Sequence, residues 1–344
     1  MNSGIMPNLI RSSVRDSARS SSLSLSFLAE TSSMVFNLLP HLKTELLAQF
    51  PDAKFNSGNA KITEDWQIDF LKGCEVAVIG IEKYTERVIS SLPQLKVIAC
   101  CSVGVDHLYP AVLKKYGVRL GWIAGVNKVS VAELTVSLMI NVIRKINSFN
   151  LGLRAGVWPQ SRMGLHLRGR TVGIHGCGNV GKEVVRLLQP FGVTLLACDR
   201  VNYADFYREF GVTPVSPQEL WRRSEILTLH LPKNSSTMGL YTPAVLDQLR
   251  PGCFLVNTAR GGIVDEAALA RNLGNGRIAA AAFDVLSEEP PARGDLLALL
   301  KMPNFLGTPH IGGSAREAWE AMGRAGIQSI TQNAVPEPGV YPFD

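Results

Sequence analysis

The stretch TVGIHGCGNVGKEVVRLL, residues 171–188, joins a short apolar strand pattern to a helical pattern through three glycines. Gly176, Gly178 and Gly181 have the G-x-G-x-x-G spacing of dinucleotide-binding turns. In such a turn the first glycine allows a tight bend, the second lets the backbone approach a pyrophosphate, and the third lets helix and strand pack closely. The N-terminus of the following helix then offers free N–H groups to the phosphates. The stretch therefore predicts a strand, a nucleotide-binding turn and a helix.

A second stretch, VTLLACD, reads as the next strand and ends in Asp199, 18 residues past Gly181. An acid at this place accepts hydrogen bonds from the adenosine ribose, and its charge repels the 2′-phosphate of NADP. We therefore predict NAD as the cofactor. Arg200 follows directly, and because an arginine there can hold a 2′-phosphate, it weakens this preference.

Around the turn, apolar runs alternate with helical segments along most of the chain. Six short apolar runs between residues 170 and 309 predict a doubly wound parallel sheet. Runs at 74–80 and 95–101, with an alternating run at 23–29, predict a parallel sheet in the first part of the chain. A long, mostly apolar helix is expected at 129–146, and its composition predicts burial between domains or between subunits.

The 344-residue length suggests two domains. We expect a nucleotide-binding domain at 126–314 and a second domain formed by 23–125 and 315–344, because the last helix can carry the chain back to the first sheet. Residues 1–22 are rich in Ser and Arg and poor in acids, which predicts a disordered tail, with a transit peptide for organellar import as the alternative.

The composition excludes several classes of function. The net charge of +6 is spread without a basic run, so we expect no nucleic-acid partner. No apolar run reaches the roughly 18 residues of a membrane span, so we expect no membrane association. The six cysteines form no C-x-x-C pair and lie in or beside apolar runs, which predicts free thiols, no metal site and a cytoplasmic location.

Charged and imidazole groups follow three of the predicted strands. They are Arg260 in LVNTARGG, Asp284 and Glu289 in AAFDVLSEEPP, and His310 in TPHIGG. Ligands of open α/β sheets sit beyond the carboxyl ends of the strands, so we expect one crevice to collect all four. An arginine suits a carboxylate, a histidine exchanges protons near neutral pH, and a glutamate beside it raises its pKa. Each residue alone has a structural alternative, but together with the nucleotide turn they favour catalysis.

The stretches TVGIHGCGNVG, LHLP, LVNTARGGIVDEAAL, AAFDVLSEEP and TPHIGG resemble the D-isomer-specific 2-hydroxyacid dehydrogenase family. The resemblance covers about residues 70–325 and is closest to phosphoglycerate dehydrogenase-like members. It implies an α/β fold of two Rossmann-like domains with parallel sheets, the nucleotide-binding domain being inserted in a discontinuous substrate domain. It also implies a homodimer joined through the NAD-binding domain, and reversible hydride transfer between NAD(H) and C2 of a 2-hydroxy or 2-keto acid.

The resemblance further implies roles for single residues. Arg260 binds substrate, His310 exchanges the proton and Glu289 sustains its charge; these are the predicted catalytic residues. The predicted cofactor contacts are Gly176, Gly178, Asn179, Val180, Gly181, Asp199, Arg200, Pro232, Thr237, Thr258, Ala259, Arg260, Asp284, His310 and Gly312. The predicted substrate contacts are Ser102, Val103, Gly104, Arg260, His310 and Lys83.

Some of these roles are more detailed. Asp284 is expected to bind the nicotinamide amide, and Pro232 and Thr237 to line the adenosine and phosphate side. The loop CSVGVDHL would hold the substrate carboxylate through the N–H groups of Val103 and Gly104, although a tight glycine turn is the alternative. Glu133, in a matching SVAEL stretch, is expected to be a buried structural acid at the domain junction.

The sequence leaves the substrate and one rival function open. Candidate substrates are 3-phosphoglycerate with 3-phosphohydroxypyruvate, glyoxylate and hydroxypyruvate. Lys83 either meets a second anionic group such as a phosphate or is a solvated surface lysine. Formate oxidation needs no proton relay, so the pair of Glu289 and His310 argues against it. An NAD(H)-sensing binding protein of the corepressor type is the alternative to an enzyme, because such proteins keep residues similar to Arg260, Glu289 and His310.

Overall fold

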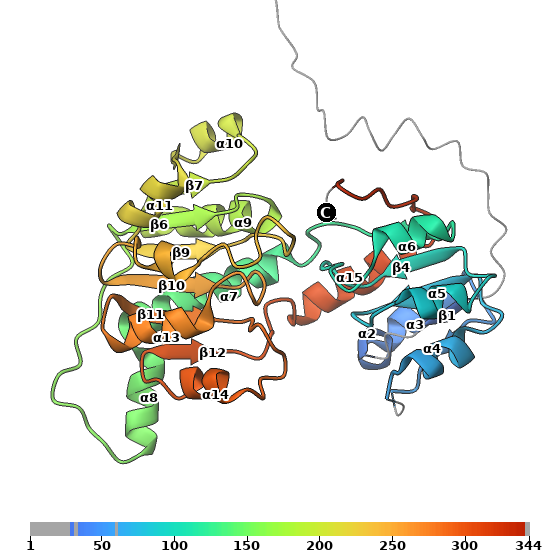
Figure 1. Cartoon of the computed structure of the whole chain (residues 1–344), viewed down its shortest axis with the longest axis horizontal. Coiled ribbons are helices and arrows are strands. Elements are labelled where there is room, and N and C mark those ends of the chain that lie inside the picture. Colours follow the sequence, from blue (N-terminus) through green and yellow to red (C-terminus); the bar gives the residue numbers. More distant parts are fainter. Residues whose placement is uncertain (1–27, 31–33, 59–60, 341–344) are drawn as a thin grey trace, which may run out of the picture.

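The structure is a computed structural model that describes residues 28–30, 34–58 and 61–340 (Figure 1). The chain forms two lobes, each built on a parallel sheet that is covered by helices. The first sheet has the strand order β2-β1-β3-β4-β5, and the second has the order β12-β11-β10-β9-β6-β7-β8. The predicted α/β fold with two parallel sheets is therefore confirmed.

The first lobe contains the strands β1 Leu28–Glu30, β2 Lys54–Phe55, β3 Val76–Ile79, β4 Val97–Cys100 and β5 Arg119–Gly121. Its helices are α2 Met34–Leu38, α3 Pro40–Leu47, α4 Glu64–Leu71, α5 Glu86–Ser90 and α6 Pro110–Lys115. Every residue of β3 and β4 is buried, as their continuous apolar runs predict. Most of the alternating run predicted at 23–29 lies outside the described residues, as does the predicted tail at 1–22.

The second lobe contains β6 Thr171–His175, β7 Thr194–Cys198, β8 Val212–Pro214, β9 Ile226–Leu229, β10 Cys253–Asn257, β11 Ile278–Phe283 and β12 Phe305–Gly307. Its helices include α9 Asn179–Leu188, α10 Ala204–Glu209, α11 Pro217–Arg223, α12 Pro243–Leu246, α13 Glu266–Gly274 and α14 Gly294–Leu300. Six of these strands are the predicted apolar runs. The seventh, β8, was missed because only its first residue is buried and it ends in a proline, so it has no apolar run.

A long helix packs on the sheet of the second lobe. Helix α7, Lys128–Arg144, packs against α9, β10 and β11, and it ends at Lys145, which adopts a left-handed conformation with φ 56°. The predicted helix at 129–146 is therefore two residues shorter at its end, and a separate helix, α8 Ile146–Arg154, follows. Glu133 is exposed on α7, so its predicted burial is wrong; the neighbours at 131–132 and 135–136 form the buried face instead.

The last helix, α15 Arg316–Ser329, lies on the first lobe, against α2, α3, β4 and β5. Small residues allow the close approach: a Cβ built on Gly326 would overlap the Cys101 sulfur, and one on Gly121 would overlap the Ser329 carbonyl. This path returns the chain to its first sheet, as the hypothesis of an inserted domain requires. The boundaries placed at 126 and 314 stay a prediction.

Within the described ranges, no helix is both long enough and apolar enough to cross a membrane. No group of three His, Cys, Asp or Glu side chains in that part of the chain has the arrangement of a metal site. All six cysteines are free thiols, and five of them are buried.

Candidate active site

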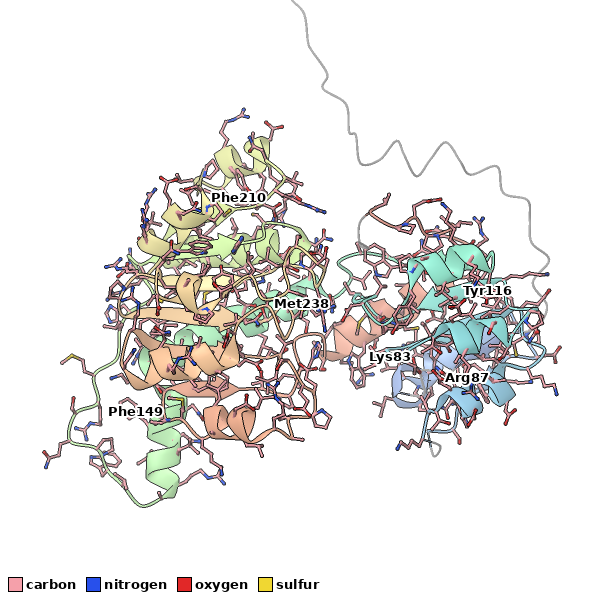
Figure 2. The ribbon with its side chains drawn as sticks, in the orientation of Figure 1. Lys83, Arg87, Tyr116, Phe149, Phe210 and Met238 are labelled. Carbon is pink, nitrogen blue, oxygen red and sulfur yellow. The ribbon has the colours of Figure 1, made fainter. Side chains whose placement is uncertain are left out.

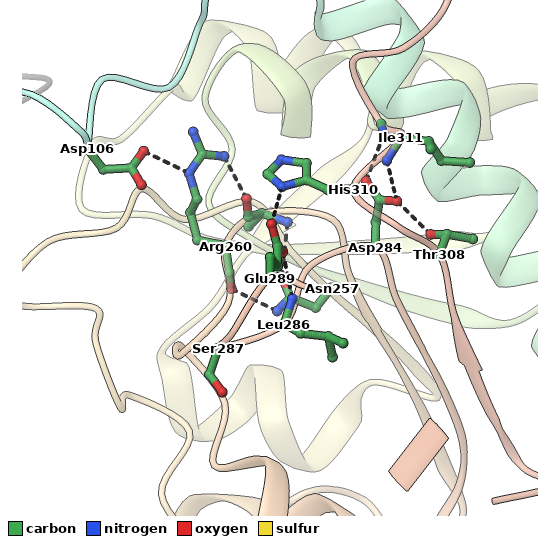
Figure 3. Close-up of polar contacts among 12 residues, drawn as sticks. Asp106, Asn257, Arg260, Asp284, Leu286, Ser287, Glu289, Thr308, His310 and Ile311 are labelled. Atoms are coloured by element: carbon green, nitrogen blue, oxygen red, sulfur yellow. Dashed lines mark hydrogen bonds and ion pairs between the residues drawn. The ribbon is translucent and has the colours of Figure 1, made fainter. Parts of the chain in front are cut away.

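The candidate site lies where the carboxyl ends of the second lobe's strands face a loop of the first lobe (Figure 3). Arg260 follows β10, Asp284 and Glu289 follow β11, and His310 follows β12. Neighbouring parallel strands end at the same edge, which brings these side chains together. The first lobe supplies the loop after β4, where Asp106 reaches Arg260.

His310 and Glu289 form a hydrogen-bonded pair, with His310 Nδ1 2.7 Å from Glu289 Oε2. The second carboxylate oxygen of Glu289 accepts the Leu286 N–H at 2.8 Å, which fixes the side chain from behind. An ionised carboxylate can only accept, so Nδ1 carries the hydrogen and Nε2 is left for a substrate. In the described part of the chain, Nε2 has no hydrogen bond.

The pair shifts the pKa of both partners. The hydrogen bond that His310 donates to Glu289 raises the pKa of His310 above its usual value, although burial opposes it. Burial raises the pKa of Glu289, but the bonds from His310 and from the Leu286 N–H outweigh it, and the net shift is downward. Glu289 is therefore ionised at neutral pH and stabilises the imidazolium.

The loop that carries His310 has an unusual backbone. His310 adopts φ 54°, in the left-handed region that few residues with a side chain occupy. Asp284 imposes this shape: its carbonyl accepts the His310 N–H at 2.8 Å, and its carboxylate accepts Thr308 Oγ1 at 2.6 Å, Ile311 N at 2.8 Å and Gly312 N at 2.7 Å. Asp284 is 1% exposed, so the carboxylate is first of all a part of the loop. Its predicted bond to the nicotinamide amide stays a prediction, with one acceptor position left.

The guanidinium of Arg260 is held at two of its nitrogens. Nη1 donates to the Ala259 carbonyl at 2.7 Å, and Nε donates to Asp106 Oδ1 of the first lobe at 3.1 Å. Buried Asn257 closes the turn below, because its amide donates to the Arg260 carbonyl and its oxygen accepts the Ala259 N–H, both at 3.0 Å. Nη2 has no hydrogen-bond partner among the described residues and is the donor left for a ligand.

The predicted carboxylate loop lies directly against that guanidinium. A Cβ built on Gly104 would overlap Arg260 Nη2, so only glycine fits the observed approach. Two further contacts shape the loop: Ser102 Oγ donates to the Gly104 carbonyl at 2.9 Å, and Trp122 Nε1 donates to the Val103 carbonyl at 2.8 Å. Residues of the two lobes, far apart in sequence, are thus in contact at this site.

The glycine turn fits a dinucleotide. Gly176 has φ 91°, and a Cβ on Gly181 would overlap the Gly176 carbonyl, so these two glycines serve the bend and the close packing. Nothing lies within 4 Å of a Cβ built on Gly178, which leaves open space at the start of α9. Gly178 also caps α9 without a side chain, so the first N–H groups, including those of the predicted contacts Asn179 and Val180, are not capped from within the chain.

Asp199 is folded against this turn. Its Oδ2 accepts the Cys177 N–H at 2.6 Å and its Oδ1 accepts the Val201 N–H at 2.9 Å. The carboxylate is thereby fixed beside the glycines, at the strand end where an adenosine ribose would lie. Arg200 is exposed next to it.

The remaining predicted residues differ in how they are placed. Thr237 is buried, and its hydroxyl donates to the Pro232 carbonyl at 2.6 Å, so it shapes its own loop. The Thr258 hydroxyl lies 2.8 Å from that of Thr135 on α7. Lys83 is exposed on the first lobe, on the side nearer the second lobe in Figure 2, and no side-chain contact joins it to the group around Arg260. Two site residues, Asp106 and Asn257, were not predicted, although both lie inside motifs that were recognised.

Together, the nucleotide turn, the open parallel sheet and the acid-base pair at the edge of that sheet define a dinucleotide-dependent α/β oxidoreductase architecture. The sequence model of the D-isomer specific 2-hydroxyacid dehydrogenase, NAD binding domain, matches residues 136–312. The chain belongs to the D-isomer specific 2-hydroxyacid dehydrogenase family. The predicted family and the predicted cofactor, NAD, are thereby confirmed.

Similar proteins agree with this family. D-3-phosphoglycerate dehydrogenase of Archaeoglobus fulgidus is 35% identical over 278 residues, which cover 78% of this chain and 52% of that protein. The chain thus spans about half the length of the phosphoglycerate dehydrogenases that it matches. Hydroxypyruvate reductase of Thermotoga maritima is 33% identical over 83% of this chain and 93% of its own. The structure of D-lactate dehydrogenase from Aquifex aeolicus, complexed with NAD and lactic acid, superposes with a TM-score of 0.78 and 25% identity, covering 89% of this chain and 94% of that one.

Replacing Asp199 with alanine is expected to narrow the preference for NADH over NADPH by about tenfold. The substitution removes the charge that opposes a 2′-phosphate and leaves Arg200 free to attract it. Dissociation constants of both nucleotides, measured by fluorescence quenching, test this role. Equal affinity of the unmodified protein for NADH and NADPH would refute it. Asp205→Asn is the control, because Asp205 is an exposed acid of the same lobe that pairs with Arg208.

Proposed function

We propose that this protein is an NAD-dependent D-2-hydroxyacid dehydrogenase that interconverts a 2-hydroxy acid and its 2-keto acid. The observation that carries the proposal is the 2.7 Å pair of His310 and Glu289, at the same edge of the sheet as Arg260. This pair supplies a proton donor whose pKa is raised toward the working range, beside a cation suited to a carboxylate.

The residues divide the work as follows. The substrate carboxylate binds to the Gly104 loop and to Arg260 Nη2, which also polarises the C2 oxygen. His310 Nε2 donates a proton to that oxygen on reduction and removes it on oxidation, while Glu289 holds the ring and stabilises its charge. Bound NADH supplies the hydride. Asp284 keeps the His310 loop in its observed conformation, in which the imidazole pairs with Glu289.

The candidate substrates are small keto acids: hydroxypyruvate, glyoxylate and 3-phosphohydroxypyruvate. The names of the similar proteins, hydroxypyruvate reductase and D-3-phosphoglycerate dehydrogenase, support this range. The phosphorylated acid requires an additional cation, and Lys83 and Lys233, both exposed, are the lysines that we assign to that role if it is used.

Oxidation of NADH with a panel of 2-keto acids, pyruvate included, tests the function. Turnover with at least one of them supports the dehydrogenase, and the relative kcat/KM values identify the substrate. NADH binding without turnover of any acid would favour the alternative, an NAD(H)-sensing binding protein.

Replacing Gly104 with alanine is expected to lower kcat/KM about tenfold while the melting temperature changes little. The new methyl group would overlap the end of the Arg260 side chain and lie close to the Asp106 carboxylate, and both side chains can move aside at small cost in stability, but the substrate donor on Arg260 moves as well. Gly181→Ala is the contrasting variant, because its methyl group meets a backbone carbonyl that cannot move so easily. A Gly104→Ala protein with full activity would remove Arg260 and this loop from the substrate site.

We also propose a homodimer formed through the second lobe, in a reducing compartment such as the cytoplasm, where the free thiols persist. The segment of α8 and the loop after it exposes an apolar face: Leu151, Leu153, Val157, Trp158 and Met163. Trp158 is 73% exposed, which is costly for a monomer and ordinary for a covered interface. Light scattering should give twice the chain mass, and the double variant Leu153→Asp with Trp158→Asp should give the monomer mass.

A further inference from the structure

Asp106 is the acid through which the first lobe contacts the candidate site. It follows the Gly104 loop, and its Oδ1 accepts Arg260 Nε at 3.1 Å from a residue 154 positions further along the chain. Burial raises the pKa of Asp106, but the charge and hydrogen bond of Arg260, with a smaller contribution from Lys233, lower it overall. Arg260 follows β10 and Lys233 follows β9, so one first-lobe carboxylate faces two cations of the second lobe.

The contact restricts the guanidinium of Arg260. A long arginine side chain has many rotamers, and a single bond from Nη1 to the Ala259 carbonyl leaves the planar group free to swing. The second bond, from Nε to Asp106, fixes the plane and leaves Nη2 against Gly104. We propose that Asp106 is a positioning residue of this site, which holds the substrate-binding face of Arg260 from the first lobe and offsets its charge. The proposal rests on the dehydrogenase function proposed above.

The charge of Arg260 also reaches the proton donor. His310 is surrounded by Glu289 and Asp284, whose charges raise its pKa, and by Arg260, whose charge lowers it. Asp106 neutralises part of that positive charge at a distance. Removing the Asp106 carboxylate is therefore expected to lower the pKa of His310, in addition to loosening Arg260. This second effect distinguishes a positioning residue from an ordinary surface ion pair, which contributes little to stability and does not move the pH profile of a catalytic group.

The experiment compares the full-length protein with Asp106→Asn, Arg260→Lys and the double variant, using the keto acid that the unmodified enzyme reduces best. Asp106→Asn should lower kcat/KM about 10- to 100-fold, mainly through a higher KM, and should move the alkaline limb of the reduction profile to lower pH. The NADH dissociation constant and the melting temperature should stay close to those of the unmodified protein. Oxamate, a keto-acid mimic, should bind more weakly to the NADH complex of Asp106→Asn.

The double variant tests whether Asp106 acts through Arg260. A lysine lacks the Nε–H group through which Arg260 donates to Asp106. Asp106→Asn should therefore lower kcat/KM only slightly further when Arg260→Lys is already present. Asp205→Asn, which neutralises a 98% exposed acid, is the control for the loss of one carboxylate. The positioning role is overturned if the unmodified protein is active and Asp106→Asn keeps kcat/KM within twofold with an unchanged pH profile. It is also overturned if the effects of Asp106→Asn and Arg260→Lys on kcat/KM are fully additive. Absence of turnover in the unmodified protein overturns the proposed function itself, and the inference with it.

Discussion

Replacing His310 with alanine is expected to lower kcat by about 10²–10⁴ in both directions, the usual contribution of a general acid-base group. Nε2 is the only imidazole nitrogen left for substrate, because Nδ1 is bonded to Glu289 at 2.7 Å. Without it, the alkoxide that forms on reduction has no protein proton donor at this position. NADH affinity should change little, since the nucleotide turn and Asp199 lie on other strands.

The conformation of His310 requires a second variant. Alanine at φ 54° is strained, so His310→Ala changes the loop as well as the chemistry. Asparagine tolerates the left-handed region and keeps a polar side chain, so His310→Asn isolates the loss of the imidazole. His166→Ala, at an exposed histidine of the same lobe, controls for the removal of a ring. Near-normal kcat in either His310 variant would exclude the acid-base role. The measurements are steady-state kcat at saturating keto acid and NADH.

In the second lobe, the glycine turn and the grouping of the site residues can be predicted from local sequence features. The glycine turn is predictable because each glycine meets a local structural requirement. Gly176 has a positive φ, Gly178 borders open space, and Gly181 packs closely against the Gly176 carbonyl. The grouping of Arg260 and His310 is predictable as well, because the loops that follow parallel strands lie at the same edge of the sheet. These features depend on the order of strands and on residue types, both of which the sequence carries.

Contacts between the lobes do not follow from such patterns. Asp106 reaches Arg260 only because the loop after β4 faces the end of β10, and no local period encodes that approach. Asp284 illustrates a related limit, since its residue type suits a nicotinamide amide while its three loop partners become visible only with the backbone folded. Glu133 was placed in the interior from its motif, but the helical phase of α7 turns it outward.

Replacing Glu289 with glutamine should lower kcat/KM about 10- to 100-fold, the effect of removing a charge-assisted hydrogen bond. It should also shift both pH profiles. The folded-state pKa of His310 is raised chiefly by its bond to Glu289, so a neutral amide of the same shape lets that pKa fall. Reduction requires the imidazolium, and its rate declines as pH rises through the pKa of His310. The decline should therefore begin at a lower pH in the variant.

Oxidation provides the complementary test of Glu289, because it requires neutral imidazole and slows as pH falls through the same pKa. Its acid limb should move to lower pH in Glu289→Gln, in the same direction as the limb for reduction. A loss of folding or of NADH binding would lower both rates without moving either limb. The two profiles together therefore distinguish a change in the pKa of His310 from a loss of functional protein. Glu288→Gln is the matched control, since Glu288 is the neighbouring acid and contacts Arg293 rather than the histidine. Unmoved limbs in Glu289→Gln would mean that the 2.7 Å contact does not set the pKa of His310 during turnover.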